Sequence, residues 1–191
     1  MVDVWRIFLD DAVVPPPTAG ESARAARFKS PQHAARYLKA HGAMRSILKR
    51  YTSTRLEFAL REKGKPYLPM APTVRFNLSH SHGMALVAVS LEWEVGVDVE
   101  RMRPMPDFVA VAERFFPPSE AMPVSEADFF RRWTRVEAVL KARGVGLYGA
   151  SSEADGDWTI AEVEVGEGYA GAVAVEGKGI AVSLRDYGGQ E

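Results

Sequence analysis

The stretch EVGVDVERMRP, from Glu94 to Pro104, decides how this chain is expected to fold. Its apolar and polar residues alternate, and a period of two predicts a half-buried β-strand. Side chains two positions apart share a face, so Asp98 and Glu100 should point the same way, with Cα atoms roughly 6.5–7 Å apart. Two neighbouring carboxylates repel each other, and a cation between them turns that penalty into binding. Oxygen ligands favour a hard ion, so Mg²⁺ is the candidate, with Mn²⁺ as a substitute; the alternative is a solvated strand edge with two ordinary surface acids.

Predicted helices and strands precede and follow this strand in a similar order. Before it lie a strand at 3–10, helices at 21–29 and 31–51, and two strands around a polar loop at 74–90. After it lie helices at 107–116 and 126–144 and strands at 158–165, 169–177 and 179–187. This repeated order predicts two similar α+β halves joined near residues 91–96.

Composition and charge set the broad class. The chain has 191 residues, 47% of them hydrophobic, enough for one large or two small domains. It has no cysteine, no apolar run long enough to span a bilayer and no basic segment typical of a signal peptide, so we expect a cytoplasmic protein without disulfides.

Residues 1–95 carry 14 Lys/Arg and 8 Asp/Glu, a balance of +6, whereas residues 96–191 carry 10 and 17, a balance of −7. A basic half at 1–95 could attract phosphates and an acidic half at 96–191 could hold a cation, or the two charged surfaces could simply complement one another.

A second motif lies in RRWTRVEAVLKARGVGL. On a helix, Trp133, Glu137 and Lys141 are successive i, i+4 neighbours and share one face. Glu137 borders the apolar stripe, where it could look into a cleft. The alternative is a surface Glu–Lys pair, worth about 0.3–0.5 kcal/mol.

Two further motifs lie in the basic half. In RFNLSHSHG, His80 and His82 are expected in a short polar loop between apolar runs, where binding groups often sit. A zinc site is conceivable, but no third histidine or cysteine accompanies them, and a histidine that caps a turn is the simpler alternative. In EKGKPYLP, Gly64 predicts a turn from which Lys65 could reach a phosphate, or simply a hairpin with a solvent-facing lysine.

The four motifs occur in one order: G-K-P, F-N-L-S-H-S, G-V-D-V-E and W-x-x-x-E-A-x-x-K. Over roughly residues 5–180, this order resembles the 4′-phosphopantetheinyl transferase superfamily, in particular its monomeric two-half type that activates surfactin-type peptide synthetases. The resemblance implies an α+β pseudo-dimer with the active site in the cleft between its halves. It also implies Mg²⁺-dependent transfer of the 4′-phosphopantetheine arm of coenzyme A to a serine of an apo acyl or peptidyl carrier protein, releasing 3′,5′-ADP.

The same resemblance implies roles for individual residues. Asp98, Glu100 and Glu137 match the metal-binding acids, and Lys141 matches a lysine that holds the phosphate. Glu137 is the expected general base, directly or through a water, and Lys141 is expected to stabilise developing charge. The residues that match coenzyme A contacts are Lys65 near the adenine, Ser79 and His80 near the ribose 3′-phosphate, and the basic residues Arg24 and Arg36. We expect His80 to donate a hydrogen bond to that phosphate as an imidazolium.

One departure from the family pattern concerns Val136, which stands where the family has a lysine before Glu137. It could change carrier preference or turnover. It also keeps two alternatives open: a coenzyme A- or nucleotide-binding module without transfer activity, and a Mg²⁺-dependent phosphohydrolase. No nucleic-acid or membrane partner is expected. The sequence does not indicate whether the carrier serves fatty-acid, polyketide or peptide synthesis.

Overall fold

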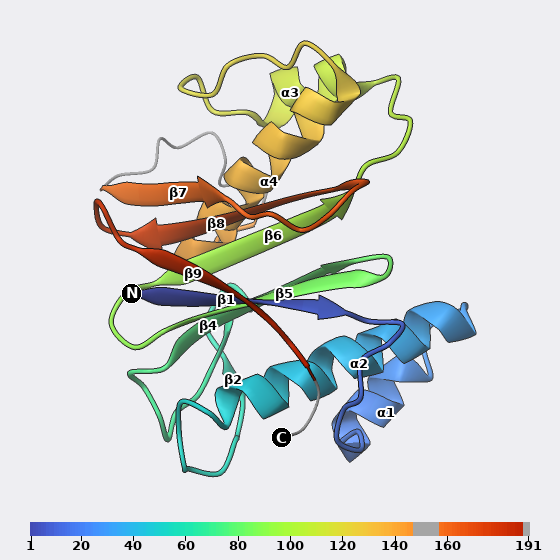
Figure 1. Ribbon diagram of the computed structural model, residues 1–191, viewed down its shortest axis with the longest axis vertical. Helices are drawn as coiled ribbons and strands as arrows, with labels where there is room; N and C mark the ends of the chain where they lie inside the picture. Colours follow the sequence, from blue (N-terminus) through green and yellow to red (C-terminus); the bar gives the residue numbers. More distant parts are fainter. Residues whose placement is uncertain (147–156, 189–191) are drawn as a thin grey trace.

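The computed structural model describes residues 1–146 and 157–188, and its helices and strands lie close to their predicted positions (Figure 1). The helices within these residues are α1 (Ala19–Ala25), α2 (Pro31–Leu48), α3 (Phe108–Phe115) and α4 (Glu126–Arg143). The strands are β1 (Val2–Phe8), β2 (Ala59–Leu60), β3 (Pro66–Tyr67), β4 (Arg75–Ser81), β5 (Met84–Ser90), β6 (Val95–Arg101), β7 (Trp158–Glu162), β8 (Tyr169–Glu176) and β9 (Val182–Asp186). The predicted α+β class is thereby confirmed. Among the described residues, no helix combines the length and apolar character needed to cross a bilayer.

Two sheets form the centre of the protein. Within the described residues, a four-stranded sheet has the order β4-β5-β1-β9 and a three-stranded sheet has the order β6-β8-β7, while β2 and β3 form a separate hairpin. Neighbouring strands are antiparallel except for β1 and β9, which are parallel. Because β9 comes from the end of the chain, a late strand completes the sheet that is otherwise built from residues before 95. A boundary at residue 95 therefore divides the helices but not all of the strands.

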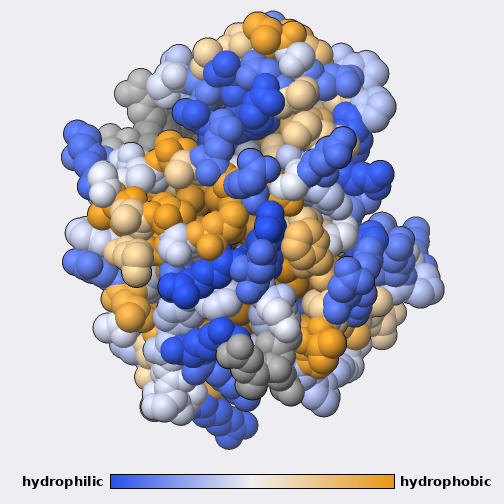
Figure 2. Space-filling view, viewed as in Figure 1, coloured by the Kyte–Doolittle hydropathy of each residue, from blue (hydrophilic) through white to orange (hydrophobic). Residues whose placement is uncertain are grey.

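The sheets stack face to face between two layers of helices, with α1 and α2 on one side and α3 and α4 on the other (Figure 1). Successive side chains of β1 point to opposite faces, so Ile7 packs with Ile47 of α2 whereas Val4 packs with valines of the second sheet. Strand β5 is buried on both faces, which explains its continuous apolar run MALVAV. Figure 2 shows apolar residues gathered over the strand layers, between mostly polar regions above and below.

Helix α4 lies directly against β6, and local sequence explains why. Ser125 caps its N-terminus by accepting a hydrogen bond from the Asp128 N–H, and Gly144, at φ 67°, ends it in the left-handed conformation. At the crossing point, a Cβ on Gly96 would lie 2.1 Å from the carbonyl oxygen of Ala138. Only glycine allows the helix backbone to come this close, and this contact brings the polar face of α4 over the carboxylates of β6.

One predicted boundary is wrong. His80 was expected in a polar loop, but β4 continues through Ser81, and His80 pairs with Ala85 of β5. The turn contains only His82 and Gly83, because His82 adopts a φ of 52° that few non-glycine residues accept. His80 is therefore held by a regular ladder rather than by a loop.

Candidate functional site

The two carboxylates of β6 face α4 and the neighbouring strand β4. Val97 and Val99 pack in the core between the sheets, so the alternate residues Asp98 and Glu100 lie on the opposite face. Asp98 is 3% exposed. Glu100 lies nearer the end of β6 and is only partly buried. The structure thus places both acids on one face, beside the helix that carries Glu137 and Lys141.

Asp98 is the centre of a small buried cluster. Its Oδ1 accepts a hydrogen bond of 2.8 Å from the Ser79 hydroxyl and one of 2.5 Å from the Lys141 ammonium. Lys141 also donates to Ser79 Oγ at 3.0 Å. Asp98 Oδ2 is buried and has no hydrogen-bond partner among the described residues. An unpartnered buried carboxylate oxygen is costly, and its presence indicates a missing cation or donor.

The pKa values of the other two acids, Glu100 and Glu137, are raised by their surroundings. Burial raises the pKa of Glu100, and the charge of Asp98 raises it further. Burial also raises the pKa of Glu137, where the favourable charge of Lys141 is opposed by those of Asp98 and Glu100. The three carboxyl groups therefore repel one another electrostatically in a partly buried region, and a bound cation would relieve that repulsion.

The fit of a metal ion depends on how many protein ligands it needs. Within residues 1–146 and 157–188, no group of three or more His, Cys, Asp or Glu side chains is placed to hold a metal by itself. This leaves a zinc site at His80 and His82 without support. Mg²⁺ differs, because it usually binds through one or two carboxylates and completes its shell with waters and substrate phosphates. Asp98, Glu100 and Glu137 do not form such a group of three, but Asp98, whose Oδ2 has no partner among the described residues, and the neighbouring Glu100 offer two carboxylates that fit that mode of binding.

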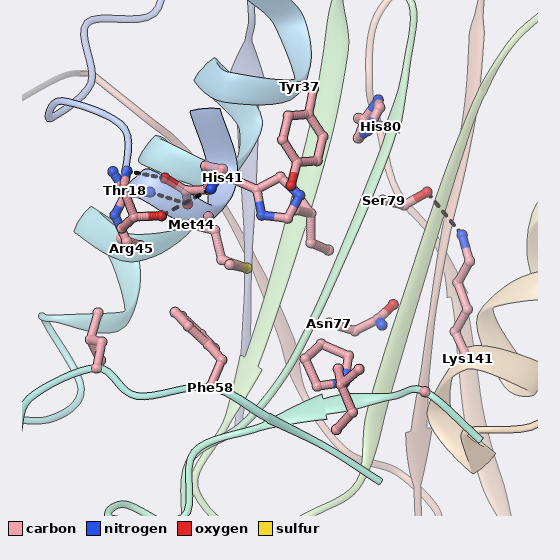
Figure 3. Close-up of a pocket in the computed structure, with 17 residues that line it drawn as sticks. Thr18, Tyr37, His41, Met44, Arg45, Phe58, Asn77, Ser79, His80 and Lys141 are labelled. Atoms are coloured by element: carbon pink, nitrogen blue, oxygen red, sulfur yellow. Dashed lines mark hydrogen bonds and ion pairs between the residues drawn. The ribbon is translucent and has the colours of Figure 1, made fainter. Parts of the chain in front are cut away.

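A cavity of about 700 Å³ adjoins this cluster. Ser79, His80 and Lys141, all predicted site residues, line it, and so does Asn77 (Figure 3). The opposite wall was not predicted from the sequence; it includes Tyr37, His41, Met44, Arg45 and Phe58. The cavity therefore lies over β4 with Lys141 of α4 at its edge, and apart from Lys141 the described residues that line it belong to the first 80 residues of the chain.

The surroundings of the two histidines that line this cavity lower their pKa values. Desolvation lowers the pKa of His80, and the positive charge of Lys141 lowers it further. Burial lowers the pKa of His41 to about 4. Both shifts favour the neutral imidazole, whereas the charge of an anion bound beside His80 would act in the opposite direction and raise its pKa.

Among the cavity residues that were not predicted, Arg45 is one that the sequence could have indicated. It is 9% exposed, and its guanidinium pairs with Glu21 and donates to the Pro16 carbonyl at 2.7 Å. An arginine inside the apolar segment AMRSIL of a helix indicates a buried, partnered charge. The arginines that were predicted lie elsewhere: Arg36 makes a bidentate pair with Asp10, at 2.9 and 2.7 Å, and Arg24 is exposed on α1. Neither lines the cavity.

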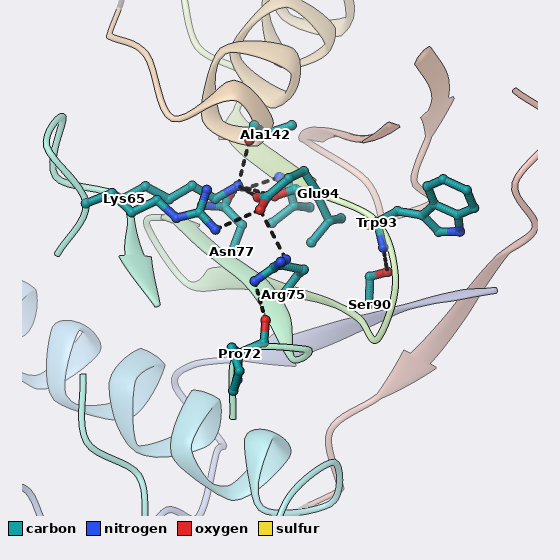
Figure 4. A network of polar contacts seen from close by, with 11 residues as sticks. Lys65, Pro72, Arg75, Asn77, Ser90, Trp93, Glu94 and Ala142 are labelled. Atoms are coloured by element: carbon teal, nitrogen blue, oxygen red, sulfur yellow. Dashed lines mark hydrogen bonds and ion pairs between the residues drawn. The ribbon is translucent and has the colours of Figure 1, made fainter. Parts of the chain in front are cut away.

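Lys65 has a different environment from the one predicted (Figure 4). Gly64 and Pro66 line the cavity, but the Lys65 side chain is 6% exposed, and burial lowers its pKa. Its ammonium donates to Glu94 Oε2 at 2.7 Å, to the Val95 carbonyl at 3.1 Å and to the Ala142 carbonyl at 2.6 Å. Lys65 thus joins the β2–β3 hairpin, the start of β6 and the end of α4.

Comparisons with known proteins address the whole arrangement. A model of the 4′-phosphopantetheinyl transferase superfamily matches residues 94–184. The chain is 37% identical over 165 residues to 4′-phosphopantetheinyl transferase HetI of Nostoc sp., which covers 76% of this chain and 70% of that protein. It is 33% identical over 156 residues to a putative 4′-phosphopantetheinyl transferase of Synechocystis sp. (75% and 63%) and 29% identical over 131 residues to 4′-phosphopantetheinyl transferase Sfp of Bacillus subtilis (63% and 57%). The last two alignments cover less than two thirds of the relative's length.

The segment matched by the family model contains both elements that carry the acids, β6 and α4. The relatives extend the likeness over three quarters of the chain, so it is not confined to this segment. The resemblance inferred from the four sequence motifs is confirmed: the chain belongs to the 4′-phosphopantetheinyl transferase superfamily.

Proposed function

We propose that this protein transfers the 4′-phosphopantetheine arm of coenzyme A to a serine hydroxyl of an apo acyl or peptidyl carrier protein, in a Mg²⁺-dependent reaction that releases 3′,5′-ADP. The observation that carries this proposal is the buried Asp98, whose Oδ2 has no partner in the described residues and whose Oδ1 is tied to Lys141 at the edge of a large cavity. Family membership supplies the reaction class.

The cavity supports coenzyme A as the substrate. It is large enough for much of a nucleotide, and its lining combines apolar and aromatic side chains with polar groups from β4 and α2. We assign His80 and Ser79 to the ribose 3′-phosphate region and the Gly64–Pro66 segment to the adenine end. Lys141, at the cavity edge, would meet the pyrophosphate.

Mg²⁺ would be held by Asp98, Glu100 and Glu137 together with substrate phosphates, and when bound it would withdraw charge from the phosphate oxygens. Lys141 stabilises negative charge on the same oxygens. Glu137, whose pKa is raised by burial, accepts the serine proton directly or through a water. The serine oxygen forms a bond to the phosphorus next to the pantetheine arm, the bridging P–O bond breaks, and 3′,5′-ADP leaves with that oxygen.

The two-half organisation is part of the proposal. The acids come from β6 and α4, whereas Ser79 and the cavity lining come from earlier residues, so neither half alone holds the site. We therefore propose a pseudo-dimer of halves 1–95 and 96–191, with β9 returning to the first sheet, that works as a monomer.

The test is to incubate the protein with coenzyme A, Mg²⁺ and a panel of apo carrier proteins, and to measure carrier mass. A gain equal to one phosphopantetheine arm, matched by release of 3′,5′-ADP, is the expected result. Free phosphopantetheine without a carrier product would instead indicate a phosphohydrolase. Coenzyme A binding without any product would indicate a binding module.

A further inference from the structure

The seam between the two sheets is closed by side chains rather than by backbone pairing. Strands β4 and β6 are edge strands of different sheets, and no backbone ladder joins them in the described residues. Alternate residues of β4 make hydrogen bonds across this gap: Asn77 Oδ1 accepts from the Val97 N–H at 2.9 Å, and Ser79 Oγ donates to Asp98 at 2.8 Å. Because these positions are two apart, they lie on one face of β4 and meet β6 in register.

Ser81 is the third member of this series, and both hydrogen-bonding functions of its hydroxyl are used. It donates to Glu100 Oε2 at 2.9 Å and accepts from the Arg101 N–H at 3.1 Å. The backbone contact limits the rotation of the hydroxyl, so the direction of the bond to Glu100 is set by β6 itself. Ser81 is not among the residues that line the large cavity.

Glu100 has few other restraints. Among the residues that the structure describes, its remaining charged neighbour in hydrogen-bond range is Arg103 at 3.5 Å, and the Arg103 side chain is 50% exposed. A contact of that length with a solvated side chain orients a carboxylate weakly. The fixed hydroxyl of Ser81 is therefore the main local determinant of where the Glu100 oxygens point.

We propose that Ser81 is a positioning residue that holds the Glu100 carboxylate in its metal-binding orientation, as Ser79 does for Asp98. This inference rests on the proposed function, because it assumes that the acids hold a divalent cation. Hydrogen-bonded partners of metal ligands typically contribute 10–100-fold to metal affinity. A serine that only closed the seam would contribute to folding stability and not to metal affinity.

The experiment measures binding of Mn²⁺ alone to the purified protein by electron paramagnetic resonance, without coenzyme A or carrier. In Ser81→Ala we expect affinity to fall about tenfold or more. Ser81→Thr should keep most of the Mn²⁺ affinity, and Ser81→Val should lose it. Because threonine and valine differ chiefly in the hydroxyl, this pair keeps the test valid even if Ser81→Ala folds poorly. Glu100→Gln should lose at least as much as Ser81→Ala.

The matched control is Ser90→Ala. Ser90 is a buried serine whereas Ser81 is partly buried, and the Ser90 Oγ accepts from the N–H groups of Glu92 and Trp93, away from the acids. It should lose stability but keep Mn²⁺ affinity. Unchanged affinity in Ser81→Ala and Ser81→Val, unchanged affinity in Glu100→Gln, or no Mn²⁺ binding by the unaltered protein would each overturn the inference. Normal Mn²⁺ behaviour with no modified carrier would instead contradict the proposed function and leave the positioning role supported.

Discussion

Replacing Lys65 by methionine separates a structural role from a ligand-binding role. Methionine keeps the apolar stem but removes the ammonium, so the carbonyls of Val95 and Ala142 lose their donor and Glu94 loses its nearest cation. Removing one partner of a buried ion pair typically costs about 3–5 kcal/mol. Glu94 keeps Arg61 at 2.8 Å, so we expect a loss at the lower end, about 3 kcal/mol in the free energy of unfolding.

The assay is urea unfolding combined with thermal melts. For a chain of this size, about 3 kcal/mol corresponds to a fall of roughly 6–12 °C in Tm. The matched control is Arg61→Met, which removes a cation from the same carboxylate. Because the Arg61 side chain is 43% exposed, that change should cost less than about 1 kcal/mol. A Lys65→Met protein as stable as the unaltered one, with a KM for coenzyme A raised tenfold or more, would refute this reasoning and restore the role expected from sequence.

Three further predictions test the packing, the titration and the acids. Gly96→Ala should lower the free energy of unfolding by about 3 kcal/mol or more and reduce transfer, because the new Cβ would meet the backbone of α4. The control Gly20→Ala, with open space around the new Cβ, should not destabilise the protein. Equal stabilities of the two variants in urea would contradict the packing argument. Burial lowers the pKa of His41 to about 4, so the folded state favours the neutral imidazole; this contributes about 3 kcal/mol to the free energy of unfolding above pH 6.5, and that contribution is lost as the pH falls towards 4. His41→Asn should therefore lose less stability between pH 6.5 and pH 4 than the unaltered protein. The same dependence of unfolding free energy on pH in both proteins would count against this prediction. Asp98→Ala and Glu137→Gln should abolish carrier modification in the mass assay, and their circular dichroism spectra should match that of the unaltered protein. Substantial transfer at saturating Mg²⁺ by either folded variant would show that the replaced residue does not belong to the active site.

Local sequence was sufficient for most of the secondary structure. Pro31 in the first turn of α2 and the turn at Gly64 are local signals, and the structure has both where they were expected. The same holds for the alternation in β6, because the direction of a side chain on a strand depends only on the parity of its position. Asp98 and Glu100 could therefore be assigned to one face before any contact was known.

The boundary of β4 was missed for a physical reason. The run SHSH is polar, and polar runs between apolar segments are typical of loops. In the structure this stretch is a strand whose face meets carboxylates instead of a core, so polarity reports on its partner and not on its backbone.

The sequence by itself determined the family, the α+β elements and the acids and lysine that share the faces of β6 and α4. Only the tertiary structure decided what lies opposite each of these groups. Lys65 meets Ala142 across 77 positions of the chain, and Ser81 meets Glu100 across 19, so neither contact follows from local periodicity. A side chain's direction is a property of its own strand or helix, but its partner depends on how sheets and helices pack. That packing is set here by close approaches such as the one at Gly96, and it buries the Lys65 ammonium beside Glu94 and brings two serines into hydrogen-bond contact with the carboxylates of β6.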